Sequence, residues 1–287
     1  MIRTITILGA GTMGHGIAKC FAQAGLPVTV YDPSSQALAL SRARMQAPAV
    51  RYCGTLEEAI PGADLVIESA TEDMAIKLAL YAELEQLLSP AAIVASNTSS
   101  YSLKALASGR SFANRMLITH FFNPAHIIPL VEIVQSADTE SHVTTAVVAL
   151  LAQCGKVPVV LNKDISGFVA NRLQAALLRE ACYLLAEQVA SAEQIDTIVK
   201  EGIGLRWAVS GPFEIADRGG LDVWKKVLEN LLPVLDNRTQ VPGIITQKVS
   251  EGHLGAKTGK GLLFGSGEAM EAGAMAQKLL RLLNGRS

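Results

Sequence analysis

The sequence predicts a Rossmann-type doubly wound α/β sheet followed by an all-α C-terminal domain. Short apolar strands alternate with helical patterns through the first half of the chain, as expected of a parallel sheet covered by helices. A glycine-rich turn, GAGTMG, joins the first strand to the first helix. Beyond Asp164 the pattern is helical with few breaking residues. We therefore expect two domains, a Rossmann domain over residues 1–163 and a helical domain over residues 164–287.

The strands of the first domain are expected where apolar runs are bounded by turn residues. Strands buried on both faces of a parallel sheet give near-continuous Val, Ile and Leu runs rather than alternation. The expected strands are Arg3–Leu8, Pro27–Tyr31, Leu65–Ile67, Ile93–Ala95, Met116–Thr119, Leu130–Val134 and Val157–Leu161.

Helices are expected between these strands and throughout the second domain. The first helix follows the glycine turn and ends at Ala24, because Gly25 is a typical helix stop. The others are Gln36–Gln46, a long helix carrying Lys77, Tyr81 and Leu84, and then Ile165–Val189, Ala192–Glu201, Pro212–Leu232, Pro242–Glu251 and Glu268–Leu283.

The composition favours a compact enzyme and excludes several other classes. Apolar residues make up 49% of the 287 residues and charged residues 18%, which excludes a disordered chain. A net charge of −1 argues against nucleic acid or an anionic membrane as partner. No apolar run reaches the roughly 18 residues that a membrane span needs. The four cysteines form no CxxC pair, so no zinc or redox site is predicted, and a reducing cytoplasmic location is expected.

The GAGTMG turn predicts a dinucleotide site because of its context. It follows a predicted strand, begins a helix, and precedes the acidic Asp32 by 18 residues from its last glycine. Gly9 permits the tight turn, Gly11 lets the backbone approach a pyrophosphate, and Gly14 lets the helix pack on the strand. The free N–H groups of the helix terminus, at Thr12 and Met13, suit phosphate.

Asp32 indicates which dinucleotide is bound. Its carboxylate can accept hydrogen bonds from the adenine ribose hydroxyls and would repel a 2′-phosphate. No Arg or Lys follows within several residues. The sequence therefore predicts NAD rather than NADP as the cofactor.

A second group of polar residues indicates alcohol oxidation. His120, in the HFFNP segment, can take a hydroxyl proton near neutral pH. Glu132 lies in an apolar run, IIPLVEIV, and a buried carboxylate needs a partner. His120 is a sensible partner, although a single histidine is more often structural than catalytic. A metal site at His120 and His126 lacks an evident third ligand.

These segments resemble the L-3-hydroxyacyl-CoA dehydrogenase family over nearly the whole chain. The similarity runs from GAGTMG through SNTSS, HFFNP, VEIV and GFVANR to GPFEIADRGGLD and KTGKGLLF. It implies that His120 is the base, Glu132 its partner, and that Ser99 and Asn171 bond the reacting oxygen. It also implies that Glu72, Lys77 and Asn97 lie near the cofactor. The resemblance further implies that the helical domain binds substrate and forms a homodimer, and that the protein acts in fatty acid metabolism.

Two departures from the family concern the substrate. Family members commonly carry a helix–turn–helix arm that helps hold coenzyme A, and the segment from Pro33 to Ala63 has room for only one helix, a linker and a turn. The LRWA stretch around Arg206 is more similar to relatives that oxidise free polar substrates, such as gulonate and carnitine. The NPAHIIP segment, with Asn123, is similar to a dehydrogenase of vitamin B6 breakdown. Arg206 and Asn123 are therefore candidate substrate ligands, although Arg206 also suits a salt bridge.

Three hypotheses follow. The leading one is NAD-dependent interconversion of a 3-hydroxyacyl compound, most commonly the coenzyme A thioester in this family, with its 3-oxo form. The second keeps this chemistry but uses a free hydroxy acid or alcohol of the gulonate, carnitine or pyridine-carboxylate type. The third is a non-catalytic NAD-binding protein such as the lens crystallins recruited from the family, and the intact His120, Glu132, Ser99 and Asn171 count against it.

Overall fold

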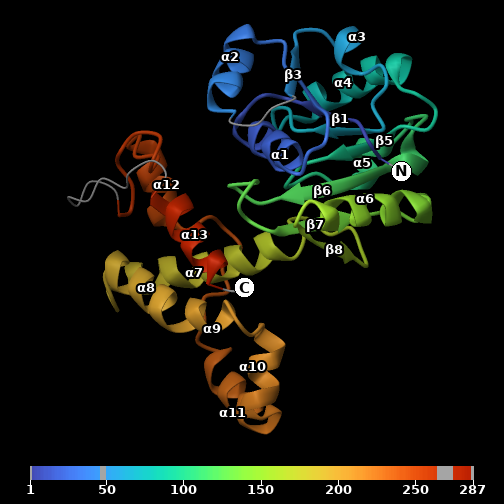
Figure 1. Ribbon diagram of the computed structural model, residues 1–287. Coiled ribbons are helices and arrows are strands. Elements are labelled where there is room, and N and C mark those ends of the chain that lie inside the picture. Colours follow the sequence, from blue (N-terminus) through green and yellow to red (C-terminus); the bar gives the residue numbers. More distant parts are fainter. Residues whose placement is uncertain (1, 46–49, 264–273, 286–287) are drawn as a thin grey trace. The chain divides into compact units, whose positions relative to one another are not determined.

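The computed structural model describes residues 2–45, 50–263 and 274–285 (Figure 1). The chain divides into two compact units. The first unit comprises Met1–Phe168 together with Met275–Ser287, and the second comprises Val169–Ala274.

The first unit is built on an eight-stranded sheet in the order β3-β2-β1-β4-β5-β6-β7-β8. Neighbouring strands are parallel except for β6 and β7, which are antiparallel. The strands are β1 (Ile5–Leu8), β2 (Val28–Tyr31), β3 (Val50–Cys53), β4 (Leu65–Glu68), β5 (Ile93–Ser96), β6 (Met116–Phe121), β7 (Leu130–Val134) and β8 (Val157–Leu161). The seven predicted strands are present, and the predicted fold class is confirmed.

Strand β3 corrects the expectation of a linker at this point. It pairs with β2 at the edge of the sheet, Val28 opposite Val50. Arg51 is exposed and only Cys53 is buried, so the segment lacks the continuous apolar run that identified the other strands. Helix α2 (Ser35–Arg44) matches most of the predicted Gln36–Gln46, whose last residue lies outside the described part of the chain.

Helices cover both faces of the sheet. Alternate residues of one strand point to opposite faces, so Leu65 and Ile67 join one buried cluster and Val66 the other. Helices α1 (Thr12–Gln23) and α6 (Ser141–Gln153) pack against the first cluster. Helices α4 (Met74–Leu87) and α5 (Leu103–Ala107), with the short α3 (Leu56–Ala59), pack against the second, and a 3₁₀ turn at Ala113–Arg115 precedes β6.

The second unit has only helices among its described regular elements, apart from an isolated β-bridge between Gly255 and Lys260. It contains α7 (Ala170–Ala186), α8 (Ala192–Ile198), a π-helical segment (Val199–Gly204), α9 (Leu205–Trp207), α10 (Pro212–Gly219), α11 (Leu221–Leu231) and α12 (Gly243–Ser250). The last helix of the chain, α13 (Ala274–Asn284), belongs to the first unit from its second residue onward. No helix of the described residues has the length and apolarity to cross a lipid bilayer.

Two predicted helices of this half are shorter than expected, for backbone reasons. Helix α7 begins at Ala170 rather than Ile165, because Gly167 and Phe168 have left-handed backbones with φ of 75° and 50°. The predicted helix Pro212–Leu232 is divided at Gly220, where φ is 86°. Residues 268–273 of the predicted helix Glu268–Leu283 lie outside the described residues.

Candidate active site

The glycine turn between β1 and α1 has the form of a dinucleotide site. A Cβ on Gly9 would lie 2.5 Å from the Ser69 carbonyl oxygen, and one on Gly14 would lie 1.9 Å from that of Gly9, so packing requires both glycines. Gly11 differs, because its φ of −65° suits any residue and a Cβ there would meet nothing within 4 Å. The space above Gly11 therefore fits a ligand that approaches the backbone. No side chain caps the α1 N-terminus, which suits phosphate.

Asp32 lies at the end of β2 and is held by backbone N–H groups. Its Oδ2 accepts a hydrogen bond from Ala10 N at 2.8 Å, and its Oδ1 accepts one from Ser34 N at 2.9 Å. A cavity of about 370 Å³ opens beside it. Among the described residues, those that line the cavity include two carboxylates, Asp32 and Glu83, and no Arg or Lys. This lining favours ribose hydroxyls over a 2′-phosphate, so the residues present fit NAD.

His120 and Glu132 face each other across the antiparallel pair β6–β7. They occupy opposite positions in the register. His120 Nδ1 lies 2.9 Å from Glu132 Oε2, and the two residues are only 5% and 2% exposed. The rings of Phe122 and Phe168 pack against the imidazole, with centroids 4.5 Å and 5.2 Å from its own. The Nδ1 side is thus engaged, and Nε2 is the nitrogen on the other side of the ring.

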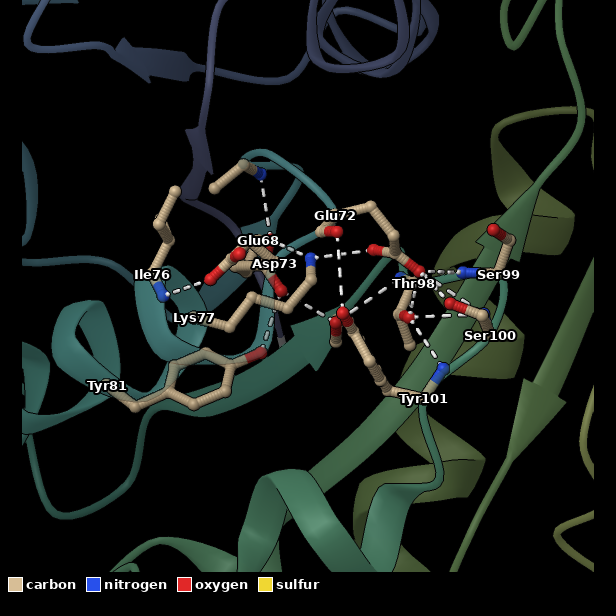
Figure 2. Close-up of polar contacts among 12 residues, drawn as sticks. Glu68, Glu72, Asp73, Ile76, Lys77, Tyr81, Thr98, Ser99, Ser100 and Tyr101 are labelled. Carbon is tan, nitrogen blue, oxygen red and sulfur yellow. Dashed lines mark hydrogen bonds and ion pairs between the residues drawn. The ribbon is translucent and has the colours of Figure 1, made fainter.

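Glu72 organises the turn after β5 (Figure 2). Its Oε1 accepts hydrogen bonds from Thr98 Oγ1 at 2.6 Å, Ser99 N at 3.0 Å, and Ser100 Oγ at 2.7 Å. Burial raises the pKa of Glu72, but the hydrogen bonds from Thr98 and Ser100, with the nearby Lys77 cation, outweigh it and lower the pKa to about 2. Glu72 is therefore ionised and holds the segment that carries Ser99.

Lys77 is buried between two carboxylates rather than solvated on a helix face. Its ammonium lies 2.7 Å from Glu68 Oε1 and 3.2 Å from Glu72 Oε2, and its side chain is 1% exposed. Glu68 also accepts a hydrogen bond from Tyr81 Oη (Figure 2). Two more come from Ser96 Oγ and the Ala70 N–H. Burial raises the pKa of Tyr81 well above its usual range, with Glu68 adding to the effect, so the phenol stays neutral and donates.

Glu68 escaped the sequence analysis, although a signal for it exists. It ends the buried strand LVIE, and a carboxylate in that position requires partners. Glu132 needs a partner for the same reason, and the counter-ion of Glu68 in the structure is Lys77.

The remaining predicted residues fall in both units. Asn97 Oδ1 accepts a hydrogen bond from Phe121 N at 2.9 Å, which joins the ends of β5 and β6. Ser99 and Asn123 are exposed, and Ser102 rather than Ser99 caps the following helix. Asn171 is the second residue of α7, and Arg206 is an exposed residue of α9, so both belong to the second unit.

A parallel sheet with a dinucleotide-binding turn, next to a buried His–Glu pair, defines a nucleotide-dependent oxidoreductase. The chain belongs to the 3-hydroxyacyl-CoA dehydrogenase family. The model of that family's NAD-binding domain matches residues 4–50 and 42–165, and the model of its C-terminal domain matches residues 167–263. The predicted cofactor is confirmed, and the protein is an NAD-dependent dehydrogenase that acts on a CH–OH group.

Two curated relatives represent different substrates. The chain is 36% identical, over the full length of both chains, to 5-formyl-3-hydroxy-2-methylpyridine 4-carboxylate 5-dehydrogenase of Mesorhizobium japonicum. It is 34% identical to a probable 3-hydroxybutyryl-CoA dehydrogenase of Bacillus subtilis, over 91% of this chain and 96% of that one.

Solved structures show the same contrast. A crystal structure of the pyridine-carboxylate dehydrogenase, described as an NAD⁺-dependent dismutase, matches with a TM-score of 0.93, at 35% identity over 100% of this chain and 98% of that one. The (S)-3-hydroxybutyryl-CoA dehydrogenase of Ralstonia eutropha matches with a TM-score of 0.74, at 34% identity over 91% of this chain and 98% of that one. The two structures are thus almost equally similar to this chain in sequence, but the pyridine-carboxylate dehydrogenase superposes on it more closely.

Proposed function

We propose that this dehydrogenase oxidises a small, carboxylate-bearing alcohol or hydrated aldehyde, with His120 as the base. His120 Nε2 takes the hydroxyl proton as the C–H bond breaks, and the hydride passes to NAD when that cofactor is bound. Glu132 holds the ring through Nδ1 and stabilises the imidazolium that forms. From the family resemblance we also propose that Ser99 and Asn171 hydrogen-bond the reacting oxygen.

The buried His120–Glu132 pair is the observation that carries this reaction. An ionisable pair that is almost fully buried is costly unless its partners are matched, as they are here at 2.9 Å. A purely NAD-binding protein has no need of such a pair. The cofactor residues that we propose beside it are Gly9, Gly11, Thr12, Met13, Gly14, Asp32, Glu72, Lys77 and Asn97.

Three observations support a free carboxylate over a coenzyme A thioester. The agreement with the pyridine-carboxylate dehydrogenase is higher, at a TM-score of 0.93 against 0.74. Between β2 and β4 the described residues form α2, β3 and α3, with no two-helix arm among them. The family match also breaks into two pieces that overlap at residues 42–50, just where α2 ends. The described residues between β2 and β4 therefore offer less surface for binding coenzyme A.

Arg206 and Asn123 are the proposed substrate ligands. A guanidinium binds a carboxylate through two parallel hydrogen bonds, which fixes both charge and orientation. The name of the pyridine relative's substrate includes a carboxylate and a formyl group. The hydrate of a formyl group is itself a CH–OH compound, so the same base suits both an alcohol and an aldehyde.

We also propose that the protein is a homodimer formed through its helical half. Among the described residues of the second unit, only Cys182 and Asp236 are buried. Many of its large apolar side chains are exposed instead, with Phe213 at 85% and Val209 at 80%. Apolar surface of this extent marks an interaction site, and a second copy presents the same apolar surface in return. Light scattering should give twice the chain mass of 30.4 kDa, and Phe213→Asp should favour the monomer.

A substrate panel tests the proposal. NADH formation would be measured with the formylpyridine carboxylate, L-carnitine and (S)-3-hydroxybutyryl-CoA, on the wild type and on His120→Ala. We expect kcat/KM to be highest for a free carboxylate and to fall about 10²–10⁴-fold in the variant. A higher kcat/KM for the thioester would restore the acyl-CoA hypothesis, and an active His120→Ala enzyme would overturn the mechanism.

A further inference from the structure

Phe168 is the last residue of the Met1–Phe168 segment of the first unit and has a strained backbone. Its φ is 50°, a left-handed conformation that bulky residues rarely adopt. Such strain persists only where the surroundings over-determine the residue, and it is common at functional sites. Phe168 N donates to Ile165 O at 2.9 Å, and Asp164 Oδ2 accepts a hydrogen bond from Leu103 N at 2.7 Å. The segment before Phe168 is therefore fastened to the first unit.

The Phe168 side chain is buried against the proposed base. The residue is 1% exposed and joins the same buried cluster as Phe112 and Ile118. Its ring centroid lies 5.2 Å from that of His120, at an interplanar angle of 55°. The left-handed backbone thus coincides with an aromatic contact to the imidazole.

One hydrogen bond does not fix the orientation of an imidazole ring. The bond from Nδ1 to Glu132 places one nitrogen, but the ring can still rock about that bond and move Nε2. Rings packed beside the imidazole limit this motion and keep water from the Nδ1···Oε2 bond. Phe122 is partly exposed, whereas Phe168 is almost fully buried, so Phe168 is the firmer of the two contacts.

We propose that Phe168 is a positioning residue that fixes the ring plane of His120 and so directs Nε2 toward the substrate. The left-handed backbone is needed to bring the ring to this position. The proposal rests on the proposed role of His120 as the base. It assigns no contact with substrate or cofactor to Phe168.

A matched pair of variants tests the proposal on the full-length enzyme. Phe168→Leu and Phe112→Leu each remove one ring from the same buried cluster, and Phe112 packs against Tyr81 instead of His120. We expect both variants to lose stability in urea. Only Phe168→Leu should lower kcat, by about tenfold, with the NAD dissociation constant changed less than about threefold, because small misplacement of a catalytic group slows the chemical step.

Imidazole ¹⁵N NMR supplies a readout independent of activity. The chain has five histidines, and the His120 signals are assigned by their loss in His120→Gln. Phe168→Leu should shift or broaden these signals, and Phe112→Leu should leave them unchanged. Unchanged signals in Phe168→Leu would overturn the positioning role. Shifted signals with wild-type kcat would support positioning and instead refute His120 as the base.

Phe168→Gly and Phe168→Ala separate the ring from the backbone. Both lack the ring, but only glycine adopts the left-handed conformation without strain, so the glycine variant should be the more stable. If the ring positions His120, the two variants lose kcat equally. Wild-type kcat in Phe168→Gly with a loss in Phe168→Ala would show that the backbone alone matters, and would overturn the proposal.

Discussion

Replacing Glu132 by glutamine is expected to slow the chemical step while the fold and NAD binding persist. The substitution keeps the shape of the side chain and removes its charge. Glu132 Oε2 lies 2.9 Å from His120 Nδ1, with both residues at least nine-tenths buried. A hydrogen bond to a charged group is worth about 1.5–3 kcal/mol. This stabilisation is needed when His120 becomes charged, so its loss corresponds to a decrease in kcat of about 10–150-fold.

A second effect of Glu132→Gln acts in the same direction. The amide can donate to Nδ1, which would leave the ring proton on Nε2, where the base must be free. In a Ser-His-Asp triad the equivalent change lowers kcat by about 10⁴. The expected decrease is therefore tenfold at least, with the larger values indicating the wrong tautomer.

The assay is the initial rate at saturating NAD and substrate, with NAD binding measured by calorimetry. Glu140→Gln is the matched control, because Glu140 Oε2 lies 3.1 Å from His142 Nδ1 in a second His–Glu pair whose side chains are 45% and 69% exposed. That control should keep wild-type kcat. A Glu132→Gln enzyme with more than half of wild-type kcat would refute the reasoning.

Three further predictions concern the cofactor, acid stability and the substrate. Asp32 should give a kcat/KM for NAD at least about 100-fold above that for NADP, because bringing its carboxylate close to a 2′-phosphate costs several kcal/mol. Equal kcat/KM values for the two cofactors would exclude Asp32 as the residue that selects NAD. The pKa of Glu72 is lowered from 4.5 to about 2. Its ionised form therefore adds to the free energy of unfolding above about pH 4.5, and this stabilisation is lost as the pH falls toward 2. Because the Glu72 side chain is 37% exposed and solvent screens its interactions, we expect this stabilisation to be about 1–2 kcal/mol. Urea unfolding of Glu72→Gln should show this deficit at pH 7 and less at pH 3, and a deficit independent of pH would contradict it. Arg206→Ala should raise the KM of a free hydroxy acid about tenfold or more and Arg206→Lys less, whereas a neutral alcohol should be unaffected by either; an unchanged KM for the acid would exclude Arg206 as its ligand.

Most of the sheet could be predicted because its strands are buried on both faces. Residues of β1 and β4 are all buried, and apart from Thr6 and Glu68 they are apolar, since helices cover each side. Strand β3 could not be found this way, because it lies at the edge and exposes Arg51. The late start of α7 could not be predicted for another reason. Phe168 has a left-handed backbone because of its surroundings, and local propensity carries no such information.

The candidate site shows a similar division. His120 and Glu132 could be paired in advance because each lies in an apolar run and each needs a partner. Their pairing across an antiparallel register was a matter of tertiary structure. The burial of Lys77 was not predictable from its helix, since it depends on Glu68 at the end of a strand nine residues earlier.

Three carboxylates at this end of the sheet hold loops, and two of them, Asp32 and Glu72, are also proposed cofactor residues. Asp32 accepts the Ala10 N–H of the glycine turn, Glu68 accepts the Ala70 N–H, and Glu72 accepts the Ser99 N–H. Recognition and loop position are therefore coupled, because removing any of these side chains also frees a backbone N–H. A loss of NAD affinity in Asp32→Ala would combine both effects. Asp32→Asn keeps one acceptor oxygen for Ala10 and removes the charge, so the difference between these two variants separates loop support from the repulsion of a 2′-phosphate.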